Sequence, residues 1–428
     1  MWASLGNCES EVWRSEFDID EVCEELVERQ RKVLSGVKSK DKILRTLCVA
    51  ADQFVVKPLG DDGGAGRTSI LAGFPWFMDW GRDACIALPG LLLGTGRFAD
   101  ARDVLLSFAR AADGGMIPNR FDDRAEVAHF NSIDASLWFV NAAFEYFERS
   151  GDEDTFGDEL LPVIRAIIEA YHKGARFGIR ADEDGLITGG DAETQLTWMD
   201  ARCNGVTFTP RYGKAVEINA LWYCGLCRLA EFYAERDVSK ARIYHEMADV
   251  AEESFNEKFW NEEKGYLNDC IRPDGTVDES MRPNQIFAVS LAFSPLSARK
   301  QRLVVRAVKK HLLTEYGLRT LSNVDERYRG RYEGDGMQRD GAYHQGTVWP
   351  YLMGAYVEAF LKVHNFSRES RLVGARCLRP LLEHVEKGGC LGSVSEIFDG
   401  DGPQKAKGCF AQAWSVGELI RAYKLCDV

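Results

Sequence analysis

The stretch Trp76–Gly90, WFMDWGRDACIALPG, combines two classes of residue that ordinarily occupy different parts of a protein. Its first eight residues include two tryptophans, two aspartates and an arginine, and the rest has the composition of a buried helix. A solvated turn does not need two tryptophans, and a hydrophobic core excludes unpaired charges. The stretch therefore predicts a polar, aromatic rim directly above the first turn of a core helix.

Helical periodicity continues outward from this stretch along most of the chain, and the amphipathic segments come in pairs. Strand-like alternation is confined to short pieces near 66–72 and 183–188. We therefore predict an all-α protein. The expected pairs are 19–34 with 39–56, 83–94 with 98–112, 132–149 with 158–174, 215–236 with 239–259, 283–293 with 297–313, and 345–364 with 369–386, before a last helix over 409–425.

The connections alternate between short turns within a pair and long links between pairs. The links are rich in Gly, Asp and aromatic residues and cover 58–82, 113–131, 175–214, 260–282, 314–344 and 387–408. Long loops without regular structure are usually functional. An up–down array of hairpins places every link at one end, so we predict an (α/α)6 barrel, a toroid whose pit the links form. A solenoid of helical pairs is the competing architecture, but the chain has no fixed-period repeat.

Composition limits the class of protein and its partners. The chain of 428 residues carries a net charge of −13, which repels nucleic acid and anionic lipid. We expect an N-terminal helical segment over 1–60, packed on a domain over 61–428. No apolar run has the length of a membrane span, and the acidic N-terminus has no signal core, so we expect a cytoplasmic protein.

Twelve cysteines raise the question of disulfides or metal binding. They are scattered, and Cys224 and Cys227 form the one CxxC, inside a helical run with no histidine nearby. Buried free thiols are common in reduced proteins, so we interpret them as core residues rather than as a metal or redox site.

Polar residues of unusual type cluster in the links and in the first helical turns after them. In HFNSIDASLWF, Asp134 and Trp138 lie on one face of a helix that has apolar residues on its other faces. A carboxylate there either caps the helix N-terminus or lines a cavity, and Trp138 favours the cavity.

A second cluster, TQLTWMDARCNGVTFTPRYGKAVEINALWY, contains Trp198, Asp200, Arg211 and Glu217. Asp200 follows Thr197, Trp198 and Met199, an environment that raises the pKa of a carboxyl group and keeps it protonated near neutral pH. A general acid requires this property.

The C-terminal part contributes a further set. His344, Gln345 and Trp349 precede a helix, and Gln412 and Trp414 begin the last one. Glu396 stands in a turn of small residues, where we expect a hydrated, ionised carboxylate that could activate water.

These residue types together favour a carbohydrate ligand. Tryptophan stacks on sugar rings, while Asp, Asn, Gln and Arg hydrogen-bond to hydroxyl groups. Two carboxyl groups in different environments are the apparatus of glycosidic bond hydrolysis. Carbohydrate is therefore the expected substrate class.

Six blocks of the sequence also resemble a known family. They are GFPWFMDWGRDACIALPGLLLGTGRFADAR, NSIDASLW, QLTWMDA, TPRYGKAVEINALWY, YHQGTVWP and SEIFDG with AQAWS. Between Leu71 and Ala422 they resemble the amylo-α-1,6-glucosidase domain of glycogen debranching enzymes. The resemblance implies an (α/α)6 barrel that hydrolyses α-1,6-linked glucosyl stubs of glycogen-type glucans with inversion. It implies an α-glucan substrate and neither a cofactor nor a metal.

By this resemblance, Asp200 corresponds to the general acid and Glu396 to the general base. Arg82 and Asp83 resemble residues that hold the non-reducing glucose, and Trp76 or Trp80 could stack on it. The remaining residues that we expect to bind substrate are Asp134, Trp138, Trp198, Arg211, Glu217, His344, Gln345, Trp349, Gln412 and Trp414.

Two departures from the family and three other functions bear on this interpretation. Many relatives carry a β-rich N-terminal domain, and the bifunctional eukaryotic enzymes carry a transferase domain, for which this chain is too short. A glucoamylase-like enzyme or a trehalase would share the barrel, and a non-catalytic glucan-binding module would share the ligand. A plain helical scaffold would leave the polar links unexplained. The oligomeric state is not determined by the sequence.

Overall fold

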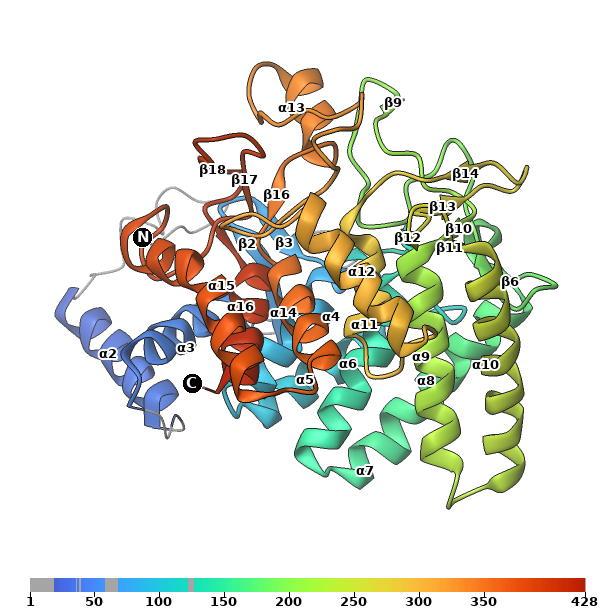
Figure 1. Ribbon diagram of the computed structural model, residues 1–428. Coiled ribbons are helices and arrows are strands. Elements are labelled where there is room, and N and C mark those ends of the chain that lie inside the picture. The colour runs from blue at the N-terminus through green and yellow to red at the C-terminus, as the bar shows by residue number, and fades with distance from the viewer. Residues whose placement is uncertain (1–18, 36, 38–39, 58–67, 122–126, 428) are drawn as a thin grey trace.

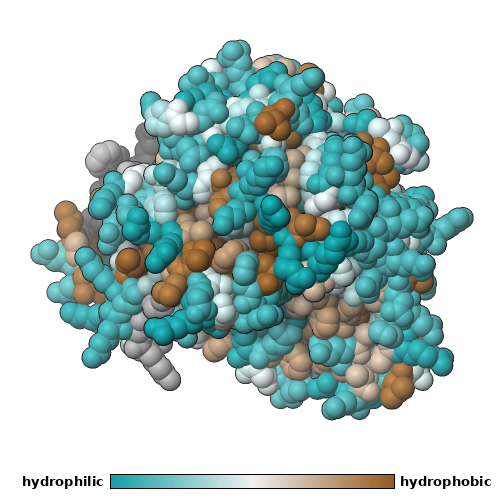
Figure 2. Space-filling model, viewed as in Figure 1, coloured by the Kyte–Doolittle hydropathy of each residue, from teal (hydrophilic) through white to brown (hydrophobic). Residues whose placement is uncertain are grey.

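Helices dominate the computed structural model, which describes residues 19–35, 37, 40–57, 68–121 and 127–427 (Figure 1). The structure thus confirms the prediction of a mostly helical protein. The predicted boundary between residues 60 and 61 lies outside the described residues. The face in Figure 2 is largely hydrophilic, with apolar side chains scattered over it.

Six helical elements of the described chain contact one another in a closed order. Each contacts the next, from α4 through α6, α9, α11, α14 and α16 back to α4. Every residue of α4 is buried, as expected for a helix surrounded by protein on all sides. Their bounds are α4 Gly81–Leu88 with its continuation η1 Pro89–Leu93, α6 Ala135–Ser150, α9 Val216–Tyr233, α11 Phe287–Ser290 after the 3-10 turn η4 Pro283–Ile286, α14 Leu352–Val363 and α16 Ala413–Cys426.

A second set of helices packs outside this ring. Its members are α3 Lys42–Phe54, α5 Phe98–Arg110, α8 Leu161–Lys173 after α7 Glu153–Thr155 and η2 Phe156–Leu160, α10 Val238–Lys258, α12 Ala298–His311 and α15 Arg368–Lys387. The outer helix α10 buries only one side, which includes Ala248, Ala251 and Phe255. The N-terminal helix α2, Ile19–Ser35, contacts α3, which in turn packs on α16.

The order of the elements explains where the links lie. Each short turn connects a ring helix to the outer helix that follows it, and each long link leads from an outer helix back to the next ring helix. All ring helices therefore begin directly after a long link. Because the helices of successive pairs alternate in direction, the links and the N-termini of the ring helices gather at one end.

Short antiparallel strands join the links to one another. Val348 of β16 pairs with Arg319 of β15 and with Phe398 of β17, and Gln412 of β19 pairs with Gly73 of β2. These pairings connect segments that are far apart in sequence. The strands are β1 Val55–Val56, β2 Ser69–Phe74, β3 Phe77–Asp79, β4 Arg120–Phe121, β5 Ala128–His129, β6 Arg180–Ala181, β7 Ile187–Thr188, β8 Arg202–Cys203, β9 Val206–Thr207, β10 Lys214–Ala215, β11 Trp260–Asn261, β12 Tyr266–Leu267, β13 Cys270–Ile271, β14 Val277–Asp278, β15 Leu318–Arg319, β16 Val348–Trp349, β17 Ile397–Phe398, β18 Ala406–Lys407 and β19 Ala411–Gln412.

One helix, α13 Gly336–Tyr343, is absent from the sequence prediction, which assigned its residues to a link. It is short and contains two glycines, Gly336 and Gly341, so its helical signal is weak. A capping box between Asp335 and Gln338 begins it and was the available signal. In addition, α14 begins at Leu352 rather than at residue 345.

Two glycines allow α4 with η1 to approach α16 closely. A Cβ atom on Gly90 would lie 1.8 Å from the backbone oxygen of Gly417. A Cβ atom on Gly417 would in turn lie 2.7 Å from the oxygen of Ala87. Backbone cannot move aside as a flexible side chain can, so the contact that closes the ring between its first and last helices depends on both glycines.

We expect Gly90→Ala to lower the free energy of unfolding by about 3 kcal/mol, because the methyl group forces these helices apart. Gly157→Ala is the matched control, since Gly157 also lies in a helical segment and a Cβ there meets nothing within 4 Å. Urea unfolding of both variants measures the difference. Equal effects would show that the close approach does not limit stability.

Candidate active site

A cavity of about 90 Å³ opens where the links meet the N-termini of α4 and α16. Apart from Phe77 and Tyr343, all of the residues that line it are candidates from the sequence. The lining consists of Phe77, Trp80, Arg82, Asp83, Trp198, Asp200, Tyr343, His344, Trp349, Glu396, Gln412 and Trp414. The fold thus brings together residues from five separate parts of the chain.

Arg82 is the buried cation at the base of the cavity. Its Nε donates to both carboxylate oxygens of Asp134 at 2.8 Å, and its Nη1 donates to Oδ2 of Asp200 at 3.1 Å. Asp134 is fully buried and does not line the cavity. Its side chain makes no capping hydrogen bond to α6, so its place is that of a counter-ion that orients Arg82.

Asp200 is the carboxyl group that faces the cavity from the link before α9. About a third of its side chain, 34%, is exposed, whereas Arg82 beside it is 3% exposed. Burial raises the pKa of Asp200, and the positive charge of Arg82 opposes this rise without cancelling it. The environment therefore shifts Asp200 toward the protonated form, the form in which it can donate a proton.

Glu396 differs from the sequence expectation of a hydrated, ionised carboxylate, because it is only 2% exposed. Burial raises its pKa to about 7. Two donors stabilise the ionised form, the hydroxyl of Tyr343 at Oε1 and the backbone N–H of Cys409 at Oε2, the latter at 2.7 Å. The pairing of β17 with β18 brings Gly408 and Cys409 against its carboxylate, an enclosure that its small neighbours in sequence do not reveal.

Asp83 and Gln412 form a second polar edge of the cavity. The Nε2 of Gln412 lies 3.4 Å from Oδ1 of Asp83. Burial raises the pKa of Asp83 to about 8, despite the opposing charge of Arg82. Near neutral pH this carboxyl group is protonated for much of the time and can both donate and accept hydrogen bonds.

Aromatic rings enclose the remaining sides. The Trp198 ring meets those of His344 and Trp349 edge-on, with centroids 5.3 and 5.2 Å apart. Trp349 likewise meets Trp414 at 5.7 Å, and Trp414 stacks on Tyr351 at 4.4 Å. The rings hold one another in position, so the apolar surface that they offer a ligand is rigid.

Two N–H groups in this aromatic wall are buried and lack a hydrogen-bond acceptor among the described residues. Nδ1 of His344 accepts from the backbone N–H of Ala201 at 3.4 Å, which places the ring proton on Nε2. Burial and the nearby arginines hold the pKa of His344 well below its usual range, so the ring is neutral. Within the described part of the chain, His344 Nε2 and Trp414 Nε1 have no hydrogen-bond partner.

Two predicted site residues, Arg211 and Glu217, lie outside the cavity in a buried ion network. Arg211 donates to both oxygens of Glu217 and through Nε to Asp269 at 2.6 Å. Asn284 connects this network to the cavity, because it donates to Asp269 at 2.7 Å and accepts from Trp198 Nε1 at 2.7 Å. The network therefore supports the wall of the cavity from behind.

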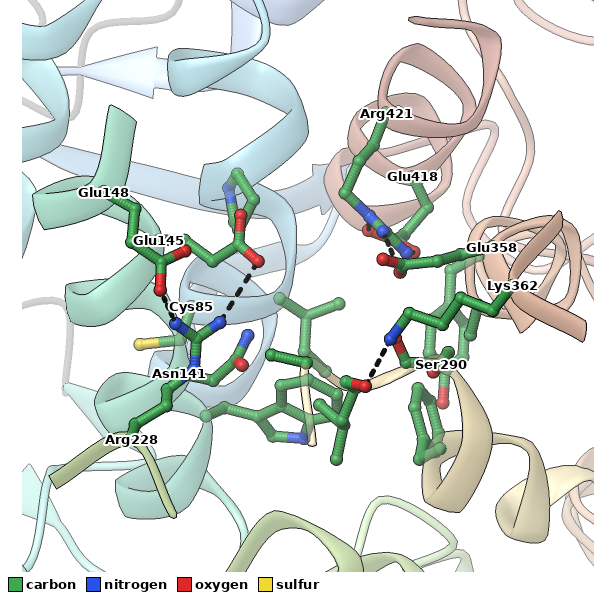
Figure 3. A pocket seen from close by; sticks show the side chains of 18 residues that line it. Cys85, Asn141, Glu145, Glu148, Arg228, Ser290, Glu358, Lys362, Glu418 and Arg421 are labelled. Atoms are coloured by element: carbon green, nitrogen blue, oxygen red, sulfur yellow. Dashed lines mark hydrogen bonds and ion pairs between the residues drawn. The ribbon is translucent and has the colours of Figure 1, made fainter. Parts of the chain in front are cut away.

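Gln345 and Trp138 also lie elsewhere. Gln345 accepts from Arg282 at 2.8 Å and faces a groove beside the cavity. Trp138 lines a separate hollow of about 190 Å³, which all six ring helices border. Figure 3 shows the ion pairs of that hollow, with Arg228 near Glu145 and Glu148 on one side and Arg421 with Glu358 and Glu418 on the other.

The sequence interpretation missed several residues of the site. Trp76 is 57% exposed and lies away from the cavity, whereas its neighbour Phe77 lines it. Tyr343 directly precedes His344, and its position in that motif was the available signal. Asp269 and Arg282 had no local signal, because their partners are distant in sequence.

The described residues contain no group of three or more His, Cys, Asp and Glu side chains arranged to hold a metal ion. In the same residues, no helix has the length and apolar character needed to cross a membrane.

Known proteins show the same combination of sequence and fold. A family model described as amylo-alpha-1,6-glucosidase matches residues 49–421. The glycogen debranching enzyme of Saccharomyces cerevisiae is 27% identical over 397 residues, which cover 70% of this chain and 26% of that protein. The chain therefore spans about a quarter of the length of this curated relative.

Two solved structures share the fold at low sequence identity. A rhamnosidase from Klebsiella oxytoca with bound rhamnose has a TM-score of 0.58 and 16% identity, and the match covers 90% of this chain and 64% of that one. A metal-independent alpha mannosidase from Streptococcus pneumoniae, in a complex with alpha-1,6-mannobiose, has a TM-score of 0.59 and 14% identity, with 94% and 99% covered.

The position of Glu217 leads to a stability prediction. We expect Glu217→Gln to lower the free energy of unfolding by about 3 kcal/mol, because it removes a counter-ion from the buried Arg211. Glu193→Gln is the control, since Glu193 is 85% exposed in its ion pair with Arg202, and we expect less than about 1 kcal/mol there. Denaturant unfolding measures both, and a negligible effect at Glu217 would contradict a supporting role.

Proposed function

Because the chain belongs to the amylo-alpha-1,6-glucosidase family, we propose that it is a glycoside hydrolase that removes α-1,6-linked glucosyl branch stubs from glycogen-type glucans. The observation that carries this proposal is the shared cavity of Asp200 and Glu396. Both carboxyl groups have raised pKa values, and a rigid aromatic wall surrounds them. The small volume of the cavity favours a single terminal sugar unit.

The contacts among the ring helices support the architecture that we propose for the family fold. The closed order from α4 to α16 with helices packed outside it is that of an (α/α)6 barrel. In such a barrel the catalytic pit lies at the end where the links gather. The cavity of Asp200 and Glu396 lies at that end.

The proposed mechanism is a single displacement with inversion. Asp200 donates its proton to the glycosidic oxygen as the C–O bond breaks. Glu396 removes a proton from a water that attacks the opposite face of the sugar, so the released glucose is the β-anomer. Inversion requires the two carboxyl groups to lie roughly 6.5–9.5 Å apart, which leaves room for that water.

The other residues of the cavity bind and orient the terminal glucose in this proposal. Asp83 and Gln412 hydrogen-bond to its hydroxyl groups, and the neutral His344 forms part of the wall behind them. Arg82 lines the part of the cavity that holds the glucose, and its hydrogen bond to Asp200 keeps that carboxyl group in place. Trp80 and Trp414 provide stacking surfaces.

We expect Asp200→Asn to reduce the release of glucose from a singly glucosyl-branched dextrin by about a thousandfold or more, because general acid assistance is lost. Proton NMR of the wild-type reaction identifies the bond that is cleaved and the anomer of glucose that is released first.

A panel of α-1,6, α-1,4 and α,α-1,1 glucosides separates debranching from glucoamylase-like and trehalase activity. Near-full activity of Asp200→Asn, or an α-anomer as first product, would contradict the mechanism.

The pKa of Glu396 predicts the acidic limb of the pH profile. A base must be ionised, so kcat/KM falls as the pH drops through about 7. Tyr343→Phe removes a hydrogen bond to the ionised form, which raises the pKa of Glu396 further. We expect the acidic limb to move to higher pH by on the order of one unit.

Tyr332→Phe is the control for this shift. Tyr332 contacts the ring of Tyr343 at 5.6 Å, and no hydrogen bond connects it to Glu396 within the described structure. The acidic limb of the pH profile of kcat/KM should therefore stay at the same pH in that variant. If Tyr343→Phe also leaves the limb unchanged, Glu396 is not the group that controls it.

A further inference from the structure

A broad groove of about 1110 Å³ lies beside the catalytic cavity, next to α13 at the top of Figure 1. Four parts of the chain form it: the segment that precedes α13, α13 itself, Gln345 just after that helix, and Phe208 from the link before α9. The residues that line it are Phe208, Glu326, Arg327, Arg329, Arg331, Glu333, Gly334, Met337, Gln338, Gly341 and Gln345. The proposed chemistry assigns no role to this groove.

The groove and the cavity share a wall. Met337 and Gly341 of α13 face the groove, while Tyr343 at the end of the same helix lines the cavity. Gln345 fixes this wall, because its Nε2 donates to the backbone oxygen of Phe208 at 2.6 Å. A polymer bound in the cavity by its terminal unit has the groove as its immediate neighbour.

The arginines of the groove differ in their partners. Arg327 pairs with Asp325 at 2.8 Å, and Arg331 with Asp399 at 3.4 Å. Arg329 is exposed, and its Nη1 donates only to the backbone oxygens of Glu326 and Tyr328. Within the part of the chain that the structure describes, no carboxylate forms an ion pair with Arg329. Its other N–H groups are therefore available to a ligand.

An aromatic side chain also lines the groove. Phe208 is half-buried, and a Cβ on Gly341 would lie 3.4 Å from its ring, so helix α13 passes directly against it. An aromatic ring in the same groove as guanidinium and amide donors is a combination that suits sugar rings and their hydroxyls. The carboxylates of Glu326 and Glu333 offset most of the arginine charge, which favours an uncharged polymer over a polyanion.

We propose that this groove binds the glucan chain that carries the branch, with Arg329 as a hydrogen-bond donor and Phe208 as a contact surface for its sugars. The inference rests on the proposed hydrolysis of branch stubs and extends it from the cleaved unit to the chain. A branch stub is attached to a long glucan chain, and that glucan chain needs a binding surface outside the cavity. Binding energy from such remote units can be used at the reacting centre.

The test compares a long substrate with a short one. We expect Arg329→Ala to lower the ratio of kcat/KM on a glucosyl-branched dextrin to kcat/KM on isomaltose by about tenfold, because isomaltose is too short to occupy the groove. Arg339→Ala is the matched control, since Arg339 is an exposed arginine of the neighbouring helix α13 but does not line the groove. The control should leave the ratio unchanged.

A binding measurement separates this proposal from the proposed activity. In native gels that contain glycogen, the wild type should be retarded and Arg329→Ala less so. If the wild type cleaves neither substrate but shows this retardation, the groove is supported and the proposed function fails. If Arg329→Ala lowers kcat/KM equally on the branched dextrin and on isomaltose, the groove is not the chain-binding site. The same conclusion follows if the variant changes neither the ratio of the two kcat/KM values nor the retardation by glycogen.

Discussion

The buried guanidinium of Arg82 is the interaction on which the site depends. Arg82 lies in the first turn of α4, Asp134 precedes α6, and Asp200 belongs to the link before α9, so one side chain connects three distant parts of the chain. A charge that is 97% removed from solvent is tolerated only when counter-ions surround it. The need to satisfy Arg82 therefore determines where Asp200 lies and how it points.

All ring helices have their N-termini at the end where the links lie, so carboxyl groups near these N-termini share a similar electrostatic environment. Asp83 and Glu217 lie in first helical turns, where the partial positive charge of the helix end favours carboxylates. Burial acts in the opposite direction and prevails for the carboxyl groups of the cavity, whose pKa values are raised. The result is a set of acidic groups whose pKa values are shifted upward, which suits acid–base chemistry.

Local sequence was a good guide wherever one helix or one motif carried the information. The helix pairs follow from periodicity, and most cavity residues follow from polar groups in aromatic surroundings. It failed where partners come from far along the chain. Glu396 has small neighbours in sequence, yet Tyr343 and the fold of its turn bury it. Trp138 has the residue type of a sugar-binding group, but the helix turns it into another hollow.

By itself, the sequence determined the helical class, the alternation of short turns and long links, and the residue types that gather in those links, because each of these is written in local periodicity and composition. Only the tertiary structure decided which candidates share a cavity and which of them serve as counter-ions. Asp134 and Glu217 are acidic like Asp200, but Glu217 pairs with Arg211, and Asp134 lies buried on the other side of the same Arg82 that contacts the partly exposed Asp200. That difference depends on contacts between distant segments, which a local pattern does not contain.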